Sequence, residues 1–378
     1  MLFGRPWRVF ALAYFLSQPL AFASNDPAVT DWNNQGVTQA RAGKFEEGIA
    51  SLRHALALDP DDQASRKNLS GILTDFARKQ ERKVPANQLA QWLEEAAALD
   101  PANGPAWVLL GDLRYLKQND SPQAIQAWQK ALPLAPSPVS RALADRIARA
   151  ERDLKIERGY AAKSTTHFII RVQEGRLFDL DALGRLLEES YAQLASELGA
   201  GPEQLAVIVY TEEALKRVSA QRDWAIGLYD GKLRLRGDEL VASLLPDLVR
   251  HELAHAFLHR LYGSGLPVWV HEGYAQSHES EQAAALRPAS MDAALKARTS
   301  WIPLKWLDGH FQQPSSHEDL MQAYAESRLV VEQIIRRQGL AKFKDFLAAL
   351  QQGQESDTAF DAVFNPWRWS RFEQGIFD

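Results

Sequence analysis

The feature that most constrains this chain is a pair of histidines four residues apart, His251 and His255, with Glu252 directly after the first. Apolar spacing over residues 245–262 predicts a helix, which places both imidazoles on one face, one turn apart. Two imidazoles so placed can share one metal ion, and Glu252 can hold a water on that metal. This short pattern also occurs by chance in ordinary helices. Here the surrounding apolar residues predict a buried helix, and two histidines on a buried helix favour a metal site over a chance occurrence.

A third ligand has to come from elsewhere, because catalytic zinc takes three protein ligands and keeps one open position. Residues 263–267 contain two glycines and a proline, which predict a turn that lets a second helix return to the first. Glu272 lies near the start of that second helix and is the best candidate. The chain has no cysteine, so nitrogen and oxygen must hold the metal, and we expect one Zn²⁺ per chain.

Three polar neighbours of this pattern are weighed separately. His259 continues the four-residue spacing, but in a straight helix it lies about 6 Å beyond His255 and cannot share the metal. His271 adjoins Glu272 and should point away from it by about 100°. Gln276 follows Glu272 by one turn, and its amide carbonyl can accept a hydrogen bond from a ligand imidazole.

The motif resembles that of the gluzincin zinc metallopeptidases, and within them the peptidase MA-like family of bacterial domains often fused to helical repeats. The residues that carry the resemblance are His251-Glu252-x-x-His255 and then Trp269-x-x-Glu272-Gly273-x-Ala275. The resemblance covers roughly residues 164–378. It implies a thermolysin-like domain in which His251, His255 and Glu272 are the ligands and Glu252 is the general base. Gln276 departs from the family, where many relatives have an acid.

The same family shows a similar Tyr-Ala-x-Ser where this chain has Tyr324. Gluzincins use a tyrosine or histidine to stabilise the tetrahedral oxyanion. Tyr324 is therefore the candidate for that role, and a plain core tyrosine is the alternative. His310 and His317 are weaker candidates.

The second half of the chain predicts an α+β domain with a small mixed sheet. Strands are expected at residues 166–172 and 205–210, the second apolar enough to be buried on both faces. Asp230-Gly231 between alternating runs predicts a hairpin over residues 224–236. That hairpin either offers an edge to an extended substrate or is a plain edge strand guarded by charges.

Residues 28–158 predict a separate domain of helical repeats. The pattern Ala-x-x-x-x-Pro recurs with prolines at 60, 101 and 136, and Trp107-x-x-Leu110-Gly111 resembles the tetratricopeptide signature. Small residues such as Gly36 and Gly111 should let paired helices approach. Such a stack either binds a peptide or partner protein, or merely supports the second domain.

The N-terminus is typical of a secretory signal over residues 1–23, with Arg5 and Arg8 before a short apolar run and Ala21-Phe22-Ala23 at the end. We expect an exported, periplasmic or secreted protein without stable membrane insertion after cleavage; an uncleaved anchor is the alternative. The net charge of -5 gives no indication of nucleic acid binding.

Together these patterns predict an exported zinc metallopeptidase that hydrolyses peptide bonds, with tetratricopeptide-like repeats for substrate or protein binding. One alternative is a repeat scaffold whose peptidase-like domain binds zinc but turns over little. Another is a metallohydrolase acting on non-peptide amides, which would use the same residues. The identity of the substrate, endo- against exo-cleavage and the partner of the repeats stay open.

Overall fold

The computed structural model describes residues 26–173, 179–218, 227–237, 244–280 and 302–371. These residues fall into two compact units that divide between Arg158 and Gly159. We call them the helical unit (residues 26–158) and the sheet unit (residues 159–371). The predicted signal segment lies outside the described residues.

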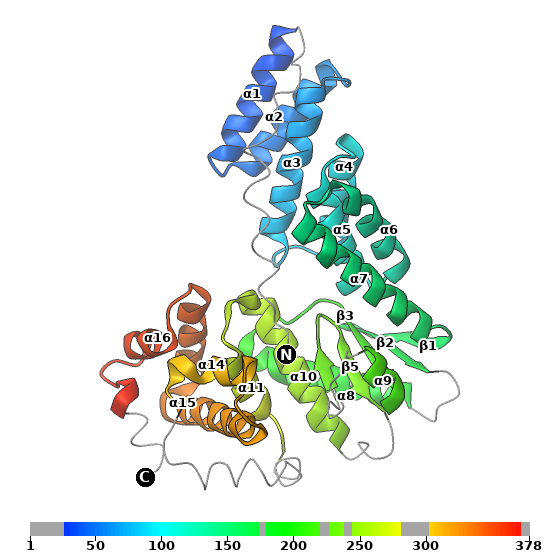
Figure 1. Ribbon diagram of the computed structural model, residues 1–378. Helices are drawn as coiled ribbons and strands as arrows, with labels where there is room; N and C mark the ends of the chain where they lie inside the picture. The colour runs from blue at the N-terminus through cyan, green and yellow to red at the C-terminus, as the bar shows by residue number, and fades with distance from the viewer. Residues whose placement is uncertain (1–25, 174–178, 219–226, 238–243, 281–301, 372–378) are drawn as a thin grey trace. The chain divides into compact units, whose positions relative to one another are not determined.

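The helical unit is built from consecutive helix pairs, coloured blue to green in Figure 1. In each pair the two helices pack along each other: α1 with α2, α3 with α4, and α5 with α6, while α7 packs on α6. The bounds are α1 (Pro27–Arg41), α2 (Phe45–Leu58), α3 (Gln63–Gln80), α4 (Ala86–Leu99), α5 (Gly104–Leu116), α6 (Ser121–Ala131), the short 3-10 helix η2 (Leu132–Leu134) and α7 (Ser137–Ile156). Helix pairing is therefore as predicted, whereas the tetratricopeptide class itself stays a prediction.

Small residues set the distance between paired helices, as the sequence predicted. A Cβ atom at Gly36 of α1 would lie 2.7 Å from Leu52 Cγ of α2, and one at Gly111 of α5 would lie 2.4 Å from the Trp128 ring of α6. The prolines at 60, 101 and 136 each come shortly after the second helix of a pair, where a residue without an N–H cannot continue the helix.

Buried amides link one helix pair to the next. Asn33 Oδ1 of α1 accepts a hydrogen bond from Asn68 Nδ2 of α3 at 2.8 Å. Asn103, the N-cap of α5, donates through Nδ2 to Ser70 Oγ at 2.8 Å and to Thr74 Oγ1 at 3.0 Å, both on α3. Because buried polar groups cost free energy unless they are paired, these bonds favour one alignment of the stack.

The sheet unit begins with a five-stranded mixed sheet in the order β1-β2-β3-β5-β4. Strands β2, β3 and β5 are parallel, and β1 and β4 are antiparallel at the two edges. The bounds are β1 (Tyr160–Ser164), β2 (Phe168–Gln173), β3 (Leu205–Tyr210), β4 (Gly227–Tyr229) and β5 (Leu233–Arg236). Both predicted strands and the predicted hairpin, β4 with β5, are confirmed, and β3 is buried along its whole length.

One face of this sheet packs against α8 (Leu180–Leu198) and α10 (Leu245–Tyr262). Phe168 and Val207 from the strands, Leu187 from α8, and Leu253 and Phe257 from α10 belong to the same core cluster. This packing fixes α10 against the sheet, and α10 is the helix that carries both motif histidines.

The opposite side of β5 is buried as well, which contradicts one of the two alternatives for the hairpin, an edge strand guarded by charges. Arg234 is fully buried; its Nε contacts Asp230 Oδ2 at 2.9 Å and its Nη1 donates to Tyr210 Oη at 2.6 Å. Lys232 is also fully buried. The second strand of the hairpin, β5, lies inside the sheet, so its first strand, β4, forms the edge on this side of the described sheet.

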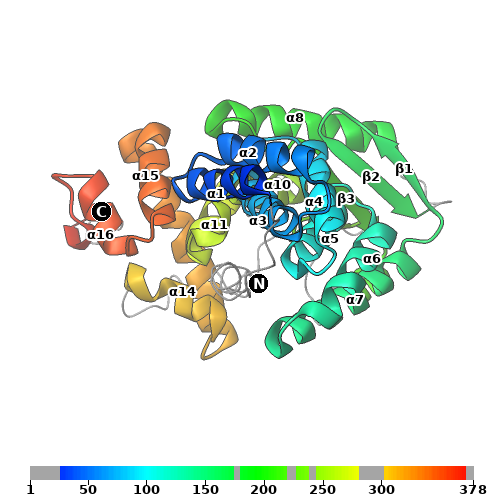
Figure 2. The same ribbon diagram turned by 90° about the horizontal axis from the view of Figure 1, so that it is seen from above.

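The remaining helices complete the core beside α10. Their bounds are α9 (Glu212–Val218), the 3-10 turn η4 (Gly263–Gly265), α11 (Val268–Gln276), α14 (Leu304–Gln312), α15 (His317–Gln351) and α16 (Ser356–Val363), and α15 bends at Gly339, where φ is 82°. Helices α11 and α15 lie against each other in both views, Figures 1 and 2. Trp369 packs edge-on against Phe360 of α16. None of the described helices has the length and apolar character needed to cross a membrane.

Candidate metal centre

Helix α10 places His251 and His255 side by side, as their spacing predicted. The helix starts after Leu244 with Pro246 in its first turn and ends at Gly263, whose φ of 73° suits a glycine. The two Nε2 atoms lie 3.2 Å apart, and His255 is buried. Both imidazoles therefore turn the same nitrogen toward one point.

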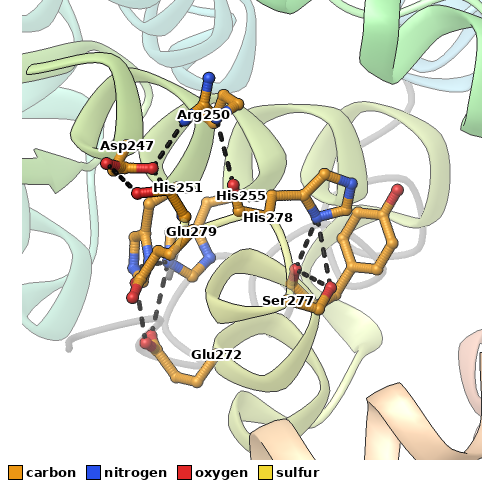
Figure 3. A network of polar contacts seen from close by, with 10 residues as sticks. Asp247, Arg250, His251, His255, Glu272, Ser277, His278 and Glu279 are labelled. Atoms are coloured by element: carbon orange, nitrogen blue, oxygen red, sulfur yellow. Dashed lines mark hydrogen bonds and ion pairs between the residues drawn. The ribbon is translucent and has the colours of Figure 1, made fainter. Parts of the chain in front are cut away.

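Glu272 completes this group from the next helix. The turn at residues 263–267 brings α11 back against α10, which confirms the predicted return. Glu272 Oε2 lies 3.8 Å from His251 Nε2, and Glu272 Oε1 lies 3.6 Å from His255 Nε2. Figure 3 shows the Glu272 carboxylate facing the two imidazoles.

The spacing of these donor atoms suits a tetrahedral metal ion. One atom from each of His251, His255 and Glu272 lies within 4.8 Å of the others. Ligands about 2.0–2.1 Å from a tetrahedral ion are about 3.3 Å apart, close to the separations found here. Among the described residues, this is the group of three side chains that can hold a metal ion.

Glu252 lies next to this group and under the edge strand β4. It is buried, and the backbone N–H of Tyr229 donates a hydrogen bond to its carboxylate. Burial raises the pKa of Glu252 to about 7, helped by the charges of Asp230 and Glu279 and opposed by His251 and the Tyr229 bond. A carboxyl group with a pKa near 7 can both accept and return a proton at neutral pH.

Glu279 is a functional candidate that the sequence did not reveal. Its Oε1 contacts His251 Nδ1 at 2.7 Å, on the far side of the ring from the proposed metal position. Burial would lower the pKa of His251, but the Glu279 hydrogen bond and the charges of Glu252, Glu279 and Glu272 raise it to about 9. The sequence pointed to Gln276 as the group that accepts a hydrogen bond from a ligand imidazole, because it follows Glu272 by one helical turn. In the structure, the residue that contacts His251 Nδ1 is Glu279.

His259 and His271 are not part of the three-residue group, in agreement with their predicted roles. His259 packs edge-on against Tyr229 of β4, with ring centroids 5.9 Å apart. His271 is buried with its ring centroid 5.8 Å from that of His255. Burial, with His259 nearby, lowers the pKa of His271 to about 3, so its ring is neutral.

Tyr324 lies on α15 in a small apolar cluster with Met321 and Ala325, and its ring meets that of Phe311 edge-on at 4.9 Å. Its role as the oxyanion group stays a prediction. Of the weaker candidates, His310 Nδ1 contacts Asp319, and His317 is exposed at the start of α15.

Residues 245–366 match the family model described as the Peptidase MA superfamily. The chain therefore carries a peptidase MA-like domain. The match begins at the first residue of α10 and runs through α16, so it includes all three members of the metal-capable group, whereas the sheet lies before it. No curated protein matches the chain. The match indicates a peptidase-like function, that is, a hydrolase acting on peptides or proteins.

Proposed function

We propose that the chain is a zinc-dependent peptidase of the gluzincin type, with one Zn²⁺ held by His251, His255 and Glu272. The observation that carries the proposal is the convergence of two Nε2 atoms and one carboxylate, within 4.8 Å, inside the stretch that matches the Peptidase MA superfamily. The donor set of two imidazoles and one carboxylate leaves one tetrahedral position open, which is the arrangement of catalytic rather than structural zinc.

The residues around this set divide the work of hydrolysis. Zinc held by these three residues would supply Lewis acidity for the scissile carbonyl and for a water. Glu252 would take a proton from the attacking water and pass it to the leaving amine, a role that its position beside the ligands and its raised pKa support. Burial of Glu272 and His255 keeps bulk water away from the ligand atoms.

The edge strand β4 is the proposed place for an extended peptide substrate. It ends the sheet beside α10, and Tyr229 of this strand touches both Glu252 and His259. A strand at the edge of a sheet can offer backbone donors and acceptors to an extended peptide, which would then lie along the catalytic carboxylate.

For the rest of the chain, we propose export through the N-terminal signal to the periplasm, or secretion, and tetratricopeptide-like repeats that bind the substrate or a partner protein. The helix pairs of the helical unit support the repeat assignment. A spacer that only supports the sheet unit is the competing role for these helices, and binding of a labelled substrate to residues 26–158 would separate the two.

The test is a comparison of the parent protein with Glu252→Gln and His255→Ala. We expect about one zinc per chain in the parent and in Glu252→Gln, and little in His255→Ala, as measured by elemental analysis. Peptide hydrolysis, followed on a peptide library, should fall about 10²–10⁴-fold in Glu252→Gln because the general base is lost.

Two outcomes would contradict the proposal. A folded parent protein that takes up no zinc, even after the metal is added back, would rule out the site. A Glu252→Gln variant that keeps its zinc and its hydrolytic rate would rule out this mechanism. Zinc binding with no hydrolysis in the parent would instead favour the scaffold alternative.

A further inference from the structure

Residues 277–280, which we call the strap, follow α11 and lie against α10 (Figure 3). Asp247 of α10 accepts two hydrogen bonds from the end of the strap, from Ser280 N at 2.7 Å and from Ser280 Oγ at 2.9 Å. Arg250 Nε donates to the His278 carbonyl at 3.1 Å, and Arg250 Nη2 also contacts Asp247 at 2.6 Å. The turn of α10 just before His251 thus fixes the strap by its backbone.

A further contact fixes the strap from α8. His278 Nε2 lies 2.8 Å from Glu197 Oε2, and Tyr274 Oη of α11 donates to the same carboxylate oxygen at 2.9 Å. His278 and Tyr274 are both largely buried, and hydrogen bonding by His278 and Tyr274 contributes to lowering the pKa of Glu197. Contacts with two helices therefore determine where the residue between His278 and Ser280 lies.

That residue is Glu279, and its Oε1 lies 2.7 Å from His251 Nδ1. We propose that Glu279, held by the strap, is a positioning residue for the metal centre. Its carboxylate accepts a hydrogen bond from the Nδ1–H of His251, which leaves the Nε2 electron pair for the metal and fixes the plane of the ring. The inference rests on the proposed metal site, because it assigns Glu279 the task of presenting one of the three ligands.

The strap explains how a chain with an amide at Gln276 can still place a carboxylate behind His251. Gln276 is the last residue of α11, and the acid comes three residues later, beyond the end of the helix. A residue outside a helix needs other bonds to hold it in place, and Asp247, Arg250 and Glu197 supply them. The side chains of Glu279 and His251 are 15% and 18% exposed, so their contact is shielded from most of the competing water.

The test measures the affinity for zinc of the full chain by competition with a chelator of known affinity. Glu279→Gln should raise the zinc dissociation constant about 10- to 100-fold, the usual effect of losing a carboxylate behind a ligand histidine. The metal-free variant should keep the circular dichroism spectrum and the single cooperative melting transition of the metal-free parent, which separates positioning from loss of structure. Glu318→Gln, an exposed glutamate in the first turn of α15, is the matched control and should leave the affinity unchanged.

A second variant tests the strap itself. Asp247→Asn keeps the shape of the side chain but weakens its two hydrogen bonds with Ser280. It should therefore also weaken zinc binding. Because both changes act through His251, the double variant should bind zinc only slightly more weakly than Glu279→Gln alone. The absorption spectrum of the cobalt(II) form should shift in Glu279→Gln, since the ligand field at His251 changes.

The outcomes distinguish this inference from the proposed function. A parent chain that binds neither zinc nor cobalt would overturn the metal site and the inference with it. A parent that binds one zinc, together with a Glu279→Gln variant of equal affinity and equal cobalt spectrum, would overturn only the role of Glu279. Fully additive effects of Asp247→Asn and Glu279→Gln would show that the strap does not act through Glu279.

Discussion

Gly227 of β4 lies beside the proposed catalytic base. A Cβ atom built at this position would be 2.7 Å from Glu252 Oε1 and 2.4 Å from Leu248 Cδ1. Both atoms are the ends of flexible side chains, so a methyl group would displace them rather than disrupt the sheet. The absence of a side chain at Gly227 therefore helps determine where the Glu252 carboxylate rests.

We expect Gly227→Ala to lower kcat for peptide hydrolysis by about 10- to 100-fold, because a shift of about 1 Å in a catalytic group costs that much. Zinc content should not change, since the three atoms nearest to such a Cβ belong to Leu248 and Glu252 and none to a proposed ligand. Steady-state kinetics and elemental analysis of the same preparation would check both. A variant with parental kcat would show that Glu252 does not depend on its contact with β4.

The metal-capable group was predictable from residue spacing, whereas the residue behind it was not. Helical periodicity gives the geometry of His251 and His255 directly, and one turn followed by a second helix limits the position of Glu272. Glu279 escapes such reasoning because it lies beyond the end of α11, where no periodicity applies. An acid downstream of a ligand helix, next to residues that can anchor a short segment, is the only signal the sequence contains.

Helix α11 crosses α15 at Gly273, and this crossing helps to place Glu272, its neighbour in the chain. A Cβ atom at Gly273 would lie 2.3 Å from the backbone oxygen of Ser327 and 2.7 Å from Val331 Cγ2. A backbone atom cannot move aside as a side chain can, so one helix would have to shift relative to the other.

Gly273→Ala should therefore lower the free energy of unfolding by about 1–3 kcal/mol, the usual cost of overpacking a core. It should also weaken zinc binding through the displacement of Glu272. Gly309→Ala in α14 is the matched control, because a Cβ atom there meets nothing within 4 Å and a helical alanine gains up to about 1 kcal/mol over glycine. Denaturant unfolding of both variants would check the sign of each change. Equal stability of the two would contradict the close contact at Gly273.

The helices and strands themselves were easier to predict than which of them pack next to one another. Strong apolar and alternating patterns gave β2, β3, the β4–β5 hairpin and the helix pairs. One of the two alternatives for the hairpin, an edge strand guarded by charges, placed Lys232, just before β5, and Arg234 in solvent, where charges usually lie. In the structure β5 lies inside the sheet, between β3 and β4, so these side chains are buried. Arg234 is paired there with Asp230 and with Tyr210 of β3.

At the scale of the whole chain, each unit has apolar clusters of its own. Residues such as Leu73, Leu93 and Trp128 belong to clusters within the helical unit, and the largest cluster lies entirely within the sheet unit. Separate cores allow separate folding, because the main stabilising term is the burial of apolar surface within each unit.

Residues 26–158 and residues 159–378, produced as separate proteins, should therefore each unfold cooperatively. The first should show the circular dichroism of a helical protein, and the second should keep the zinc stoichiometry of the full chain. Thermal unfolding followed at two wavelengths would check this. A helical unit that melts without cooperativity on its own would show that the two units stabilise each other.

The buried charges of β5 also determine how the hairpin can align. If β4 and β5 moved by one residue relative to β3, Arg234 would point into the core shared by α8 and α10, and Leu233 and Leu235 would take its place among polar partners. Such an arrangement leaves a guanidinium without its partners in an apolar core, which is strongly disfavoured. The buried Arg234 therefore disfavours a shifted alignment of β5. Through β5 it also helps to keep β4 in register, and β4 is the strand whose Tyr229 N–H bonds Glu252.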